Sequence, residues 1–257
     1  MAAPSYVIRF WRALDDLLGS VRPTRWGAVV TDGRFPAIWD ANYARLDAEA
    51  TGVTAAEIER DLLPALRASG ASIEHVVAFD PDAAVDVIAE LSARGHRLGW
   101  DAVLATDDPS SAPNPEVQAI EMDTSAWDDV RRSLGESFGI EGGDPLEQLM
   151  RLERDVLASG AKRWFGVRRE GRWVSLAALL MLEGVGYVDN VATEPAFRER
   201  GLAAAVTSHV VRTALEEGAE SVFLLADPDE PKVVALYERL GFREVARLAS
   251  TRGPVPA

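Results

Sequence analysis

The chain has 257 residues, 47% of them hydrophobic, with no cysteine and a formal net charge of −14 at pH 7. This composition allows one large or two ordinary globular domains, and it excludes disulfides, thiolate catalysis and cysteine-based metal sites. The charge argues against nucleic-acid binding, because no basic stripe could neutralise phosphates, and it favours solubility or the attraction of cationic substrates. The sequence predicts no signal peptide, and the longest uncharged apolar run, residues 174–182, is too short to cross a bilayer. We therefore expect a cytoplasmic protein without a membrane partner.

The first hundred residues mix helical and extended patterns. Hydrophobic periodicity predicts helices at residues 1–19, 54–69 and 82–94, and extended segments at residues 26–31, 35–46 and 73–79. Gly70 closes the second helix and is interpreted as its C-cap. Residues 106–116, TDDPSSAPNPE, combine three prolines with small polar residues and are typical of a linker. We place the linker at residues 109–116, between domains at residues 1–108 and 117–257.

The C-terminal half shows a second series of elements. A strand is predicted at residues 117–122, followed by helices at 125–138 and 145–159, the latter with Asp144 as N-cap. Strands at 163–169 and 173–183 are joined by a Glu-Gly-Arg turn that suits a hairpin. The remaining pattern predicts a strand near 187–191, a helix that extends to residue 217, a strand at 221–226, a helix at 231–240 and a strand near 244–250.

The stretch from residue 186 to 205, GYVDNVATEPAFRERGLAAA, is the most informative segment for function. A strand leads through a basic, glycine-bearing turn into an alanine-rich helix. Arg198, Arg200, Gly201 and Ala203 lie where the unpaired N–H groups of a helix N-terminus face outward, so a pyrophosphate would meet donors and the positive end of the helix dipole. The patterns GxxxxGK[ST] and GxGxxG are absent, which argues against a P-loop NTPase and a Rossmann dehydrogenase.

This turn resembles the acetyl-CoA loop of the GNAT acetyltransferase superfamily, which reads Arg or Gln, two residues, Gly, one residue, and Gly or Ala. Arg198, Gly201 and Ala203 occupy these positions. A second motif at residues 235–242, ALYERLGF, resembles the ALYEKLGF signature of the superfamily. Two features depart from the pattern: Ala203 replaces the commoner second glycine, and Glu230 stands where many members carry an asparagine.

The order of the elements, a ββ hairpin, a β-turn-α unit and a βαβ unit, is also similar to this superfamily over residues 117–257. The resemblance implies an α/β (α+β) GNAT fold with a central mixed, twisted sheet flanked by helices. Residues 75–82, a helix and Gly95 parallel residues 222–229, a helix and Gly241. We therefore expect a tandem arrangement in which residues 1–108 are a degenerate GNAT-like copy without a cofactor loop. The alternative is that unrelated segments share an Asp-Pro turn and a C-cap glycine.

The resemblance implies an acetyl-CoA-dependent N-acetyltransferase that moves an acetyl group by direct attack of a small-molecule amine. It also implies that acetyl-CoA contacts the turn and that backbone N–H groups of the preceding strand bind the oxyanion; the residues concerned are Val191, Ala192, Thr193, Arg198, Glu199, Arg200, Gly201, Leu202, Ala203 and Ala204. Tyr237 is the expected proton donor to the thiolate, since tyrosine with a pKa of about 10 is protonated at neutral pH. A core aromatic is the competing interpretation. Asp189, Glu183 or a chain of waters could act as the base, and Asp189 could equally be a solvated or turn-capping carboxylate.

Several other residues have simpler interpretations. The histidines, His75, His96 and His209, lack metal-type spacing, so we expect them to be structural and expect no metal. Trp127, Trp164 and Trp173 could line an acceptor pocket or pack in the core. A non-catalytic acyl-CoA sensor or interaction protein is the alternative function. The sequence allows a homodimer, and it identifies neither the acceptor nor the preferred acyl group.

Overall fold

The structure is a computed structural model that describes residues 1–47, 52–108, 116–140 and 143–256. Its internal contacts divide the chain into two units. The first consists of Met1–Val103, Ala226–Asp229 and Glu244–Ala257, and the second of Leu104–Leu225 and Glu230–Arg243. Residues 109–115 of the predicted linker lie outside the described residues, so the predicted domain boundaries stay predictions.

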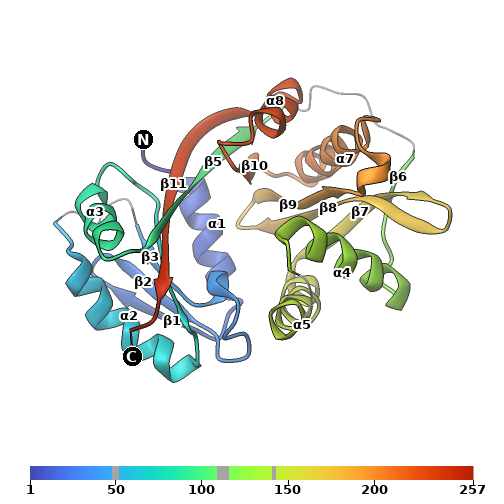
Figure 1. The fold of residues 1–257 in the computed structure, drawn as a ribbon. Coiled ribbons are helices and arrows are strands. Elements are labelled where there is room, and N and C mark those ends of the chain that lie inside the picture. Colours follow the sequence, from blue (N-terminus) through green and yellow to red (C-terminus); the bar gives the residue numbers. More distant parts are fainter. Residues whose placement is uncertain (48–51, 109–115, 141–142, 257) are drawn as a thin grey trace. The chain divides into compact units, whose positions relative to one another are not determined.

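The first unit is built on a mixed sheet with the strand order β1-β2-β3-β4-β11 (Figure 1). These strands are β1 (Ser20–Thr24), β2 (Gly27–Thr31), β3 (Tyr43–Leu46), β4 (Ile73–Ala78) and β11 (Arg243–Pro254). β3 and β4 pair in parallel, whereas the β1–β2, β2–β3 and β4–β11 pairs are antiparallel. A further strand, β5 (Arg97–Thr106), lies beside β11. The helices of this unit are α1 (Ser5–Asp15), α2 (Ala55–Ser69) and α3 (Val85–Ala93).

The helix α2 packs in this unit through apolar residues that recur at helical spacing. Ile58, Leu62 and Leu66 recur at helical spacing and are fully buried in a core that also contains Trp26. The helix ends as predicted at Gly70, whose φ of +79° is left-handed, and the N–H of Ala71 donates to the carbonyl of Leu66 at 3.0 Å. The apolar stripe and its C-cap therefore fix the place of α2 against the sheet.

The second unit has the strand order β10-β9-β8-β7-β6. Its strands are β6 (Val117–Ala119), β7 (Lys162–Arg169), β8 (Arg172–Leu182), β9 (Val185–Thr193) and β10 (Ser221–Ala226). β9 and β10 pair in parallel, and the other neighbours are antiparallel. The helical segments are α4 (Thr124–Phe138), α5 (Asp144–Arg151), a π-helical turn (Leu152–Leu157), α6 (Ala158–Gly160), a 3₁₀ turn (Pro195–Phe197), α7 (Leu202–Glu216) and α8 (Pro231–Arg239). α7 and α4 cover opposite faces of this sheet (Figure 1).

This mixed sheet flanked by helices is the α/β architecture that the sequence predicts. No described helix combines the length and the apolar character that crossing a membrane requires. The cytoplasmic location stays a prediction.

Three local predictions are wrong. Only residues 43–46 of the extended segment predicted at 35–46 form a strand, because Asn42 donates its side-chain amide to the carbonyls of Phe35 and Ile38 at 2.9 and 3.0 Å and stabilises a 3₁₀ turn before it. Asp144 is not the N-cap of α5, since Gly143 holds that position and Asp144 accepts a bond from Gln148 inside the helix. The third error is an omission: the strands β1 and β5 are both missing from the sequence prediction.

The strand predicted near residues 244–250 exists as β11, and its partner lies in the N-terminal half. Its residues Ala249 to Pro254 pair antiparallel with β4. The final residues of the chain therefore complete the sheet of the first unit.

The two segments that suggested a repeat have the same local structure. Each is a strand followed by an Asp-Pro turn and a helix, and the helices are followed by Gly95 and Gly241, with φ values of +91° and +88°. In each turn the aspartate accepts a bond from the backbone N–H two residues later, at 3.2 Å for Asp80 and 2.8 Å for Asp227. A common origin of the two halves stays a prediction.

Candidate functional site

The N-terminus of α7 presents free backbone donors. Gly201 is its N-cap with a φ of +77°, and no side chain caps the helix. The N–H of Ala205 donates to the carbonyl of Gly201 at 3.0 Å, so the N–H groups of Leu202, Ala203 and Ala204 precede the first bond of the helix. A Cβ built at Gly201 would meet no atom within 4 Å in the described part of the chain. Open space therefore adjoins the positive end of the helix dipole.

The side chains of the turn support its backbone. Arg198 donates from Nε to the carbonyl of Thr193 at 3.0 Å, and Arg200 donates to the carbonyl of Ala196 at 3.0 Å. Glu199 between them has a φ of +60°, which is unfavourable for a residue with a side chain. Both arginines are exposed. The turn is thus held in a strained conformation with its cationic groups at the surface.

The strand β9, which leads into this turn, is irregular. Leu176 of β8 pairs with Ala192, but Ala178 pairs with Asp189, so β9 contains one extra residue at this point. Asn190 in this bulge has a φ of +51°. In the described structure, β9 pairs with β10 through Val185, Gly186 and Tyr187, and the pairing ends there. Residues 191–193 therefore have β8 on one side and an edge without a β10 partner on the other. Because successive N–H groups of a strand point to opposite edges, only those that face away from β8 are available at this edge to bind an oxyanion.

Asp189, the predicted base, takes part in an ion-pair cluster. Its Oδ2 accepts from Nζ of Lys162 at 2.7 Å, and its Oδ1 accepts from the N–H of Asn190 at 2.8 Å. Nζ of Lys162 also donates to Oε1 of Glu153 at 2.8 Å. Burial disfavours the charge of Lys162, but Asp189 and Glu153 hold its pKa above the ordinary value; burial raises the pKa of Glu153 against the attraction of Lys162. Both oxygens of Asp189 thus have partners.

The alternative base Glu183 lies elsewhere. It precedes Gly184 in the turn between β8 and β9, with a φ of +50°. That turn is at the start of β9, whereas residues 191–193 are at its end. Glu183 is therefore separated by the length of the strand from the edge described above.

Tyr237, the predicted acid, is a buried residue of α8. Its side chain packs edge-to-face against Phe242, with ring centroids 5.8 Å apart, and no hydrogen bond to its hydroxyl is present among the described residues. Burial raises its pKa to about 12, so it is protonated at neutral pH but is a weaker acid than free tyrosine. Because β9 and β10 are parallel, α8 after β10 and the turn after β9 follow the same end of the sheet. The described contacts do not join Tyr237 to the turn.

The remaining candidate residues have structural surroundings. Trp164 is buried in the core between α4 and β8, and Trp127 and Trp173 pack against the same core. Among the described residues, no group of three histidine, aspartate or glutamate side chains could hold a metal ion. The bulge of β9, the left-handed Glu199 and the Lys162 contacts were missed by sequence reasoning, because each depends on backbone conformation or on strands far apart in the sequence.

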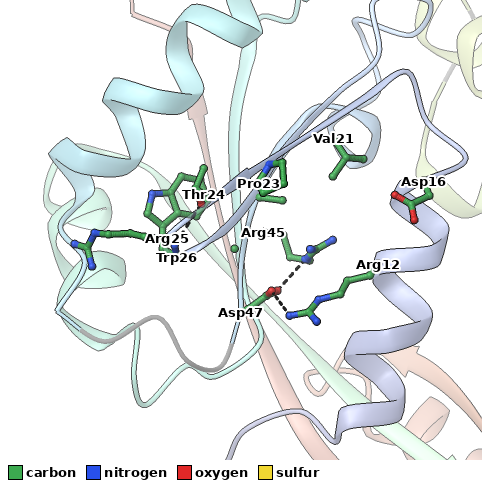
Figure 2. Close-up of a pocket in the computed structure, with 11 residues that line it drawn as sticks. Arg12, Asp16, Val21, Pro23, Thr24, Arg25, Trp26, Arg45 and Asp47 are labelled. Atoms are coloured by element: carbon green, nitrogen blue, oxygen red, sulfur yellow. Dashed lines mark hydrogen bonds and ion pairs between the residues drawn. The ribbon is translucent and has the colours of Figure 1, made fainter.

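A cavity of about 440 Å³ lies in the first unit, between α1 and the strands β1–β3 (Figure 2). Asp47 in its wall accepts from Arg12 at 2.6 Å and from Arg45 at 2.9 Å, and Arg45 is also paired with the buried Asp15. Arg25 is paired with Glu57. No predicted site residue lines this cavity, and its main charges are neutralised by their neighbours, so it is separate from the candidate site.

Comparison with known proteins gives one family and several similar folds. Residues 127–242 match the model of the acetyltransferase (GNAT) family. None of the curated proteins matches the chain.

Three solved structures resemble most of the fold. A functionally unknown conserved protein from Staphylococcus epidermidis has a TM-score of 0.70 at 11% identity, over 91% of this chain and 93% of that one. A GCN5-related N-acetyltransferase from Sphaerobacter thermophilus has a TM-score of 0.57 at 18% identity, over 78% and 67% of the two chains. Another from Kribbella flavida has a TM-score of 0.55 at 20% identity, over 83% and 82%.

The likeness to these structures concerns the fold, and the family match covers the segment that contains the β9 bulge, the turn before α7 and Tyr237. Fold, motifs and match agree with the resemblance seen in the sequence. Over residues 127–242, the chain is similar to the acetyltransferase (GNAT) family.

Proposed function

We propose that the chain is an acetyl-CoA-dependent N-acetyltransferase that moves the acetyl group directly to the amine of a small acceptor. The observation that carries this proposal is the N-terminus of α7, where three backbone N–H groups precede the first helical bond beside the open space at Gly201. A pyrophosphate at this point would receive several donors and the helix dipole together. Arg198 and Arg200, both exposed beside it, would add charge-assisted contacts.

The chemistry requires three groups around the thioester. The nitrogen lone pair of the neutral amine attacks the carbonyl carbon, and the N–H groups at the free edge of residues 191–193 would stabilise the oxyanion. The carbon–sulfur bond then breaks and the thiolate takes a proton, which Tyr237 would donate. The proton lost by the amine would pass to Asp189, directly or through water, and on to restore Tyr237.

The alternative is a non-catalytic acyl-CoA sensor, and two observations favour it. Both oxygens of Asp189 already have partners, and the pKa of Tyr237 is raised by burial to about 12. A sensor would need the pyrophosphate site but neither a base nor an acid. An enzyme would need acceptor binding to alter the surroundings of these two groups.

Both the enzyme and the sensor require binding of acyl-CoA at the N-terminus of α7. Calorimetric titration of the full chain with acetyl-CoA, and separately with CoA, tests this binding. Tight binding of one acetyl-CoA per chain supports the α7 site, and absence of binding overturns both. A panel of small amines, assayed with acetyl-CoA for release of the CoA thiol, then separates them. Turnover with one amine identifies the enzyme, whereas acyl-CoA binding without any turnover identifies the sensor.

A further inference from the structure

Four residues of the second unit form what we term the Lys162 cluster: Glu153, Lys162, Asp189 and Asn190. Lys162 is fully buried, and its Nζ lies 2.6 Å from Oε2 of Glu153 and 2.7 Å from Oδ2 of Asp189. Its ammonium also lies 5.1 Å from the ring centre of Trp164. The cluster thus joins β7, β9 and the segment before β7 through one buried cation.

Stability alone does not explain this arrangement. Removing charges from water is unfavourable, and replacing a buried ion pair by apolar residues of similar volume is commonly neutral or stabilising. The cluster contains one cation and two carboxylates, and of these three charged groups only Asp189 is partly exposed, at 26% of its side chain. A domain with a large apolar core has little need of such a group for folding.

Glu153 reaches the cluster from an irregular helix. It belongs to the π-helical turn Leu152–Leu157, which interrupts the helical segment between Asp144 and Gly160. A π-turn inserts one residue and rotates the side chains that follow, and such turns are frequent at functional sites. Two local distortions, the π-turn and the β9 bulge, therefore meet at the same cluster.

The cluster holds the bulge from both sides. Asn190, in its left-handed conformation, donates its N–H to Asp189 at 2.8 Å and its side-chain amide to Oε1 of Glu153 at 3.1 Å. Lys162 fixes the positions of both acceptors. Val191 follows immediately, and with it the strand edge that lacks a β10 partner. Any rotation at Asn190 would turn the N–H groups of residues 191–193.

We propose that the Lys162 cluster locks the Asn190 bulge and so aims those N–H groups of residues 191–193 that face away from β8 at the thioester oxygen, which makes Glu153 and Lys162 positioning residues for acetyl transfer. This inference rests on the proposed function. The inference also gives the ion pair between Lys162 and Asp189 a role in positioning the bulge. It explains why the π-turn and the β9 bulge occur at the same cluster.

The test is the double variant Glu153→Leu with Lys162→Met, which replaces the pair by apolar side chains of similar length. The matched control is Arg163→Gln with Glu217→Gln, because this ion pair starts from the next residue of β7 but is exposed, with side chains 47% and 42% accessible. The cluster variant should lower kcat about 10- to 100-fold, as expected for a misplacement of about 1 Å. The Kd for acetyl-CoA should change less than about threefold, because α7 is untouched, and the control should match the wild type.

A second readout does not depend on turnover. Amide hydrogen exchange of Asn190 should be about tenfold or more faster in the cluster variant, while the amides of α7 keep their protection. Unchanged exchange of Asn190 would overturn the inference, and so would a wild-type kcat. If the wild type turns over no amine, the proposed enzyme fails, but the exchange result still decides whether the cluster holds the bulge.

Asn190→Gly provides a second variant in case the double variant does not fold. Glycine accepts the left-handed conformation but removes the amide bond to Glu153. It should lower kcat several-fold and leave the Kd for acetyl-CoA unchanged. Wild-type turnover by this variant would contradict a positioning role of the bond.

Discussion

The carboxylate of Glu74 lies 3.5 Å from Nε2 of His96, and neither of its oxygens accepts a hydrogen bond among the described residues. Glu74 is on β4, directly opposite Gly253 of β11, and it is fully buried. Burial raises its pKa from 4.5 to about 7, with Glu59 acting in the same direction and Arg94 against it. The first unit therefore contains a buried acid that holds its proton near neutral pH.

This proton makes the stability of the first unit depend on pH. Between pH 4.5 and about 7 the folded carboxyl keeps a proton that the unfolded one has lost, so the contribution of Glu74 to the free energy of unfolding falls as pH rises through this window and is constant above it. The loss amounts to about 3 kcal/mol. Denaturant unfolding measures the free energy of unfolding of the wild type and of Glu74→Gln at several pH values. The difference between these two free energies should change by this amount across the window.

The comparison with Glu74→Gln is needed because His96 acts in the opposite direction. Burial lowers the pKa of His96, so its contribution to stability rises with pH up to about 6.5 in both proteins. Its effect largely cancels in the difference. A difference that does not change between pH 4.5 and 7 would show that Glu74 is ionised in the folded state.

Gly253→Ala should destabilise the protein by about 1 to 3 kcal/mol. A Cβ at this position would lie 2.5 Å from Cδ2 of His96, whose buried ring is packed beside Glu74 and has little room to move. The control is Gly33→Ala, where the nearest atom to a new Cβ is 3.7 Å away. Urea unfolding at pH 7 measures both, and equal stabilities of the two variants would mean that the His96 ring relaxes freely.

Local patterns in the sequence were enough to predict most helices and strands. α2 with its cap at Gly70 and the hairpin of β7 and β8 follow from periodicity and turn residues. The partner of β11 could not be predicted, because nothing local in residues 243–254 indicates pairing with β4. For this reason a fragment of residues 1–108 would lack a strand of the first unit, and the absence of a second CoA site is better tested by the stoichiometry of the full chain.

The candidate site likewise contains features that could be predicted from the sequence and features that could not. The turn at Arg198 and Gly201 could be predicted, because a strand, a basic turn and a helix are consecutive in the sequence. The bulge at Asn190 could not, since it depends on Glu153 and Lys162 from other elements. The burial of Tyr237, which determines its pKa, also depends on tertiary packing.

Gly201→Asp should weaken acetyl-CoA binding at least about 100-fold, which corresponds to about 2.7 kcal/mol. The new carboxylate would stand beside the free N–H groups of α7 and repel a pyrophosphate. Gly218→Asp is the matched control: Gly218 follows the other end of α7, has a φ of +92°, and a Cβ there also meets nothing within 4 Å in the described structure. Calorimetric titration should find wild-type affinity in this control. Unchanged affinity in a folded Gly201→Asp protein would remove the turn as the binding site.

Tyr237→Phe should lower kcat about 100-fold, within the range of general acid catalysis, and leave the Kd for acetyl-CoA nearly unchanged. Since no described residue bonds to the Tyr237 hydroxyl, its removal should not lower the melting temperature, which separates a catalytic effect from a loss of folding. Tyr187→Phe on β9 is the control for the loss of one hydroxyl in the same unit. Rates measured from roughly pH 6 to 9, on either side of the thiol pKa of about 8.5, decide the role. If both proteins turn over equally across this range, Tyr237 is a core aromatic and the thiolate takes its proton from water.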